Sequence, residues 1–119
     1  MFAFILLFTC ISLVCANSFS KTATLEKGDE VKGTAVLGVD YRTYITPTHL
    51  STTKPAITTK VQRKLVAVWV TMSSKTQTIN YLQRYNSNWQ VNTRDNTRIV
   101  WKNGTNYSSI TGSFGAEDI

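Results

Sequence analysis

The position of the cysteines constrains this chain more than any other feature. Both of them, Cys10 and Cys15, lie within the first sixteen of 119 residues. The stretch 2–14 is almost wholly apolar, and small side chains follow at Val14 and Ala16. This is the pattern of a secretory signal peptide that is cleaved after Ala16. We therefore expect residues 1–16 to be a signal peptide and residues 17–119 to form one secreted, extracellular domain without cysteine.

Such a domain has no disulfide to stabilise it, so it needs a hydrophobic core of its own, an oligomer or a partner surface. The chain also has one histidine, His49, which disfavours histidine-based metal sites and serine–histidine catalysis. We expect no metal, no cofactor and no catalytic residues, and hence a protein that is not an enzyme. Formation of a homo-oligomer by this domain is a further expectation.

The composition favours β-strands, because 18 of the residues are threonine and valine, tyrosine and tryptophan add to them. No stretch repeats apolar residues at the helical period. We expect a single antiparallel β-sandwich of about seven or eight short strands. Strand patterns cover residues 22–25, 31–39, 41–45, 61–72, 76–85, 98–102 and 107–111.

Three local expectations can be tested directly. The stretch 61–72 has apolar residues on both alternating faces, which predicts a core strand covered on both sides. Residues 46–59 contain both prolines and predict a loop or a broken edge strand. The dipeptide Asn103-Gly104 predicts a hairpin turn, with 107–111 as the returning strand.

Positive charge is concentrated in the middle of the chain. Residues 42–102 contain ten lysines and arginines and one acid, Asp95, whereas the flanking parts are slightly acidic and the whole chain has a net charge of +6. Such a field attracts anions, including acidic lipids and sulfated glycans. The secretory leader and the absence of a nucleic-acid motif argue against nucleic acid as a partner.

An aromatic stretch lies within this basic region. Tyr81, Arg84, Tyr85 and Trp89 occur within nine residues, beside several amide side chains. Tyrosine and tryptophan suit a membrane interface, a sugar face or a choline head group, because each has an apolar body and a polar tip. We predict that these four residues bind lipid or glycan. Core aromatics at a strand end are the alternative.

The sequence Tyr85-Asn86-Ser87-Asn88-Trp89-Gln90-Val91 resembles the tyrosine–serine–asparagine–tryptophan stretch of the actinoporin-like cytolysins and the related fungal fruit-body lectins. The upstream run 65–70 resembles the hydrophobic strand before it. The resemblance implies a secreted β-sandwich that binds phospholipid head groups, anionic or choline-bearing, or sugars, with Tyr85 and Trp89 as contacting aromatics. It also implies cytolysin-like activity on membranes.

A second resemblance is to immunoglobulin-like domains, through Phe114-Gly115-Ala116-Glu117-Asp118. It implies a divergent extracellular domain that binds a protein partner. Independently of either resemblance, Asn103 and Asn106 each begin an Asn-x-Ser/Thr tripeptide and are candidate glycosylation sites.

Overall fold

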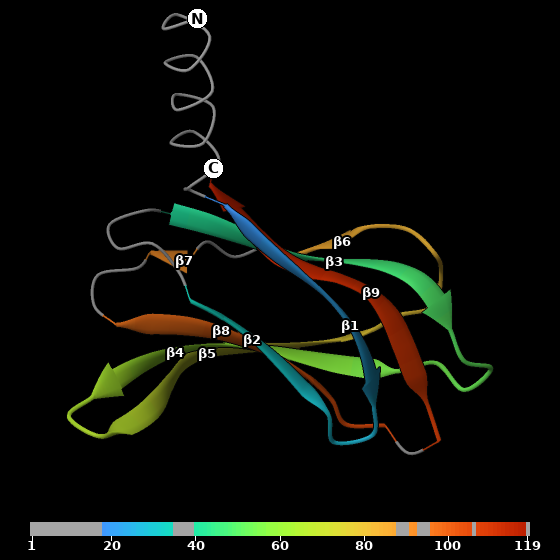
Figure 1. Cartoon of the computed structure of the whole chain (residues 1–119), viewed down its shortest axis with the longest axis horizontal. Helices are drawn as coiled ribbons and strands as arrows, with labels where there is room; N and C mark the ends of the chain where they lie inside the picture. Colours follow the sequence, from blue (N-terminus) through green and yellow to red (C-terminus); the bar gives the residue numbers. More distant parts are fainter. Residues whose placement is uncertain (1–17, 35–39, 88–90, 93–95, 106, 119) are drawn as a thin grey trace, which may run out of the picture.

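The computed structural model describes residues 18–34, 40–87, 91–92, 96–105 and 107–118, and these form two packed antiparallel sheets (Figure 1). The first sheet contains β1 (Phe19–Glu26), β9 (Ser109–Asp118), β3 (Asp40–Leu50) and two short strands that both pair with β3, β6 (Tyr85–Asn86) and β7 (Val91–Asn92). The second sheet contains β2 (Glu30–Thr34), β8 (Thr97–Asn103), β4 (Ala56–Leu65) and β5 (Val68–Thr78), in that order. The expected antiparallel β-sandwich is confirmed.

The chain passes repeatedly between the sheets. The first sheet has the order β1-β9-β3-β6, and β7 pairs with β3 along the same edge as β6. The second sheet has the order β2-β8-β4-β5. This interleaved order of eight positions is that of a jelly roll. An immunoglobulin domain orders its first sheet A-B-E-D, with the first two strands as neighbours. Here β1 pairs with β9, the last strand, so the strand order differs from that of an immunoglobulin domain, and the alternative of an extracellular domain that binds a protein partner stays a prediction.

The core lies between the inner faces of the two sheets. Tyr41 and Phe114 of the first sheet face Trp101 of the second, and all three are fully buried. The Trp101 and Phe114 rings lie 6.1 Å apart, a normal distance for packed aromatics. The smaller apolar members of this cluster are Leu25, Ile45, Ile57, Val61, Ile79, Ile99, Ile110 and Ala116.

Several local predictions are confirmed. Residues 22–25 lie in β1, residues 41–45 in β3, and residues 98–102 in β8. A turn follows β1 at Lys27-Gly28, where Gly28 has the positive φ of 83° that favours glycine.

The predicted loop over 46–59 is shorter than expected. Strand β3 continues through Pro47 to Leu50 because a register shift between Pro47 and His49 accommodates the proline, and β4 begins at Ala56. Only residues 51–55 connect the two strands.

The prediction of one core strand over 61–72 is wrong. The chain turns back at Val66-Ala67, so that Leu65 pairs with Val68 and the stretch becomes the outer half of the β4–β5 hairpin. Val66, Val68 and Met72 are exposed rather than buried. The sequence pattern does not indicate this turn, because neither valine nor alanine is a usual turn former.

The hairpin predicted at Asn103-Gly104 is also wrong, because β8 and β9 belong to different sheets. Asn103 is fully buried, and its Oδ1 accepts hydrogen bonds from the Thr105 amide and the Ser108 hydroxyl. Its Nδ2 donates to the carbonyl of Leu25 at 3.2 Å. The residue therefore fixes a crossing between sheets. In the part of the chain that the structure describes, no helix is long and apolar enough to span a bilayer.

Candidate surface-binding site

The predicted aromatic segment begins on the connection between β5 and β6, which lies at the end of the molecule opposite the β4–β5 turn, on the right in Figure 1. Tyr81 and Leu82 are exposed, at 67% and 63%, on the connection between β5 and β6. Tyr81 is thus accessible at the surface, and its role in binding lipid or glycan stays a prediction.

Tyr85 has a structural role in this segment. It is half-buried against the core, and its hydroxyl accepts hydrogen bonds from the backbone amides of Asn80 and Tyr81 at 3.0 and 3.2 Å. The tyrosine therefore holds the connection in place, and its polar tip is already engaged.

Arg84 is engaged as well. Its guanidinium lies 4.0 Å from the centre of the Tyr44 ring, its Nε donates to Asn86 Oδ1 at 3.0 Å, and it forms an ion pair with Glu117. The pair neutralises the cation, so Arg84 adds little attraction for an anion.

The motif behind the family resemblance is only partly described. Ser87 is buried, its backbone amide donates to the Thr43 carbonyl, and its hydroxyl accepts from the Thr43 amide. This exchange anchors the chain beside β3. Trp89, the fourth predicted binding residue, lies outside the described residues, so its role stays a prediction.

A second surface, which the sequence did not predict as a unit, lies on the outer face of the second sheet. Inner-facing residues of β8 are Thr97, Ile99, Trp101 and Asn103, all buried. Side chains alternate along a strand, so Arg98 and Lys102 face outward. Register pairing places Lys32 of β2 and Lys60 of β4 on the same side, and alternation along β4 places Lys64 there too. We call Lys32, Lys60, Lys64, Arg98 and Lys102 the basic face.

The basic face has little counter-charge. Among the described residues, no carboxylate forms an ion pair with any of its five cations. Glu30 lies opposite Lys102 in the register and offsets the charge at that edge only. Strands lie about 4.8 Å apart and same-face residues about 7 Å apart along a strand, so the cations form one continuous positive patch.

Trp69 lies at the hairpin end of the basic face. It pairs with Lys64 in the register, the Arg98 guanidinium lies 4.2 Å from its ring centre, and the Lys64 ammonium lies at 6.0 Å. Gln62 fixes the arginine by accepting from Arg98 Nε at 2.8 Å. The result is an aromatic ring between oriented cations.

The sequence contained a partial signal for this surface. Lys60, Gln62 and Lys64 alternate along β4, which indicates a polar outer face. Lys32 and Arg98 join them only through strand pairing between distant parts of the chain. The positive field over residues 42–102 was visible, but its assembly on one sheet was not.

The structure describes only one of the two predicted glycosylation sites. Asn103 Nδ2, the atom that carries an N-linked glycan, is fully buried and donates to two carbonyls, those of Leu25 and Ser108. A glycan there would break these bonds, so the assignment of Asn103 is corrected. Asn106 lies outside the described residues and stays a prediction.

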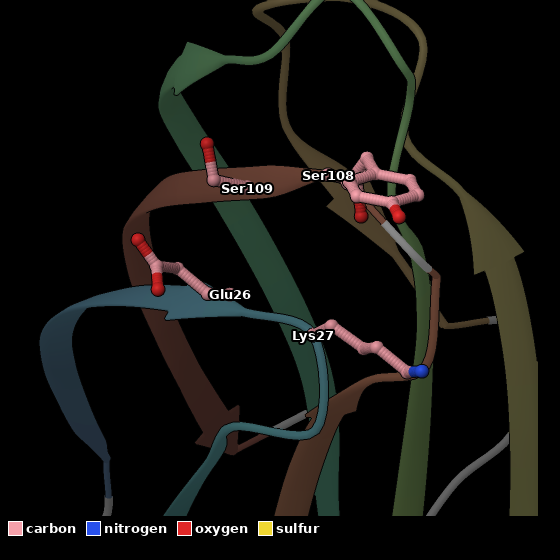
Figure 2. Close-up of a pocket in the computed structure, with 5 residues that line it drawn as sticks. Glu26, Lys27, Ser108 and Ser109 are labelled. Atoms are coloured by element: carbon pink, nitrogen blue, oxygen red, sulfur yellow. The ribbon is translucent and has the colours of Figure 1, made fainter.

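A pocket lies between the β1–β2 turn and the start of β9, lined by Glu26, Lys27, Tyr107, Ser108 and Ser109 (Figure 2). Figure 2 shows the Glu26 carboxylate and the Lys27 amine pointing in different directions. The Ser108 hydroxyl is already bonded to Asn103 and Thr105. The pocket thus lacks converging free groups. No cluster of metal-binding side chains occurs in the described ranges.

Comparison with known proteins shows a likeness in fold. No family model and no curated protein matches the chain. The crystal structure of the Yersinia pseudotuberculosis-derived mitogen has a similar fold, with a TM-score of 0.52 over 87% of this chain and 86% of the mitogen chain. At 15% identity the likeness shows the fold alone. The resemblance to cytolysins and lectins stays a prediction.

Proposed function

We propose that this chain is a secreted binding module that docks on anionic membrane lipid through the basic face. The observation that carries the proposal is the gathering of five cations on one face of the second sheet, two of them at Trp69, with no carboxylate partner among the described residues. An extended sheet surface of one sign of charge attracts an extended surface of the other sign. The proposal keeps the expected ligand class and moves the site away from Tyr81–Trp89.

Each lysine or arginine close to an anionic membrane contributes about 1 kcal/mol, or roughly fivefold in affinity. The basic face can therefore supply useful affinity without a pocket. The same electrostatics also attract a sulfated glycan, so the test must separate these two ligands.

The experiment measures co-sedimentation of the protein with phosphatidylcholine vesicles that contain or lack phosphatidylserine, at about 0.1 M salt. The variant changes Lys32, Lys60 and Lys64 to glutamine. The control changes three exposed lysines away from the basic face, Lys21, Lys27 and Lys54, and has the same net charge. We expect roughly hundredfold weaker binding for the first variant, and nearly wild-type binding for the control.

Equal losses in both variants would show that net charge, not the basic face, governs binding. Retention on a heparin column without binding to phosphatidylserine vesicles would instead assign the surface to sulfated glycans. Wild-type protein that binds neither ligand would overturn the proposal.

A further inference from the structure

The tip of the β4–β5 hairpin exposes apolar side chains where a soluble surface is usually polar. Leu65 pairs with Val68, and Val66 and Ala67 form the two-residue turn between them. Val66 is fully exposed, at 101%, and Val68 is 63% exposed. In Figure 1 the hairpin ends at the left of the molecule, well away from the core.

The backbone at Val66 is strained. Its φ is 58°, in the left-handed region that β-branched residues rarely adopt. Two-residue hairpin turns normally place glycine, asparagine or aspartate at such a position. Valine makes the turn less stable, and its exposed side chain gains nothing from packing within the chain. The fold alone therefore does not explain this valine.

Position and charge indicate what the tip contacts. Lys64 precedes the tip, and Arg98 and Trp69 lie on the basic face just behind it. Leu65 pairs with Val68 on one side of the hairpin, Lys64 pairs with Trp69 on the other side, and the exposed Val66 lies at the end between them. A tip that combines apolar side chains with cations and a tryptophan fits the interfacial layer of an anionic bilayer, where cations meet head groups and apolar side chains enter beneath them.

We propose that the segment Leu65–Val68 inserts into the interfacial region of an anionic phospholipid bilayer while the basic face holds the head groups. This inference rests on the proposed function and adds the part that penetrates. Interfacial segments of this kind reach about 5–10 Å into the boundary between head groups and acyl chains. Apolar burial then adds to the electrostatic attraction.

The first test is Val66→Asn in the full chain. Asparagine tolerates the positive φ and leaves the charge unchanged, so the fold is preserved while the apolar tip is lost. We expect about tenfold weaker binding to phosphatidylcholine–phosphatidylserine vesicles, since burying a valine side chain is worth roughly that factor. Leu82→Asn, which removes a similarly exposed apolar residue at the opposite end, is the matched control and keeps wild-type affinity.

The second test measures depth. Val66→Trp places a fluorophore at the tip, and phospholipids brominated in the acyl chains quench tryptophan that enters the bilayer. We expect extra quenching relative to the wild type for Val66→Trp and none for Leu82→Trp. Agreement of both tests supports insertion.

The outcomes separate the two proposals. Salt-sensitive wild-type binding that Val66→Asn leaves unchanged, without quenching of Val66→Trp, overturns insertion and leaves the electrostatic proposal standing. Wild-type protein that does not bind phosphatidylserine vesicles overturns both. Heparin binding without vesicle binding also overturns insertion.

Discussion

The two ends of the sandwich both expose apolar residues, but they treat their cations differently. At the Tyr81–Leu82 end, Arg84 is stacked on Tyr44 and paired with Glu117. At the hairpin end, Arg98 is stacked on Trp69 in a similar way, yet no described carboxylate pairs with it. The charge of Arg84 is neutralised by Glu117, whereas Arg98 faces outward beside four lysines.

This difference teaches that an aromatic beside an arginine is not by itself a binding site. The same pair of residue types stabilises a connection at one end and forms a charged surface at the other. The neighbouring charges decide between these roles, and they are set by strand pairing rather than by sequence proximity.

Among the single substitutions that compare the two ends, the largest expected effect comes from Trp69. Trp69→Ala removes the ring that orients Arg98 and Lys64, as well as an aromatic suited to the membrane interface. We expect about tenfold weaker vesicle binding, which corresponds to about 1.4 kcal/mol. Tyr81→Ala at the other end is expected to change binding by less than about twofold. A larger loss for Tyr81→Ala, measured by the same co-sedimentation, would restore the site that the sequence predicted.

The next effect is on stability at the Tyr81 end. Tyr85→Phe removes the acceptor of two backbone amides, those of Asn80 and Tyr81. We expect the free energy of unfolding to fall by about 1–2 kcal/mol, with vesicle affinity unchanged. Chemical denaturation measures the first quantity. An unchanged midpoint would mean that this hydroxyl does not hold the connection.

A smaller effect of opposite sign is expected at the hairpin. Val66→Gly relieves the positive φ at an exposed turn. The relief is worth about 1 kcal/mol, partly offset by the greater freedom of glycine in the unfolded chain. Thermal unfolding of this variant should occur at or above the wild-type midpoint. A clear decrease would show that the valine stabilises the fold.

The smallest effect concerns the exposed ion pair. Glu117→Gln removes the negative charge that pairs with Arg84, and both side chains are 40% exposed, so the loss of stability should stay below about 1 kcal/mol. The change also frees a cation at the Tyr81 end. Vesicle binding that rises strongly would mean that this end is a latent binding surface.

The sequence was sufficient to predict the class of fold. Threonine content, strand-like alternation and turn residues predicted an antiparallel sandwich, and β1, β3 and β8 lie where expected. The hairpin at 66–67 was missed because valine and alanine give no turn signal. The hairpin prediction at Asn103-Gly104 was wrong because the asparagine side chain is buried and forms hydrogen bonds there. Its partners are Leu25, distant in the sequence, and Ser108, across the following turn.

The kinds of residue in the candidate site could be predicted from the sequence, but the location of the site on the fold could not. The basic middle of the chain and its tryptophans indicated an aromatic and cationic surface. The register of β2, β8 and β4 then brings Lys32, Arg98 and Lys60 together, although 66 positions separate the first two. Such pairing between distant strands cannot be read from local patterns.

The central claim is that one face of the second sheet meets the membrane. Acetylation of exposed lysines in the unmodified protein, free and bound to phosphatidylserine vesicles, tests it directly, with modified positions read by mass spectrometry. The account predicts protection of Lys32, Lys60 and Lys64 on binding, while Lys21, Lys27 and Lys54 react equally in both states. Uniform protection, or protection of the second group alone, would contradict it.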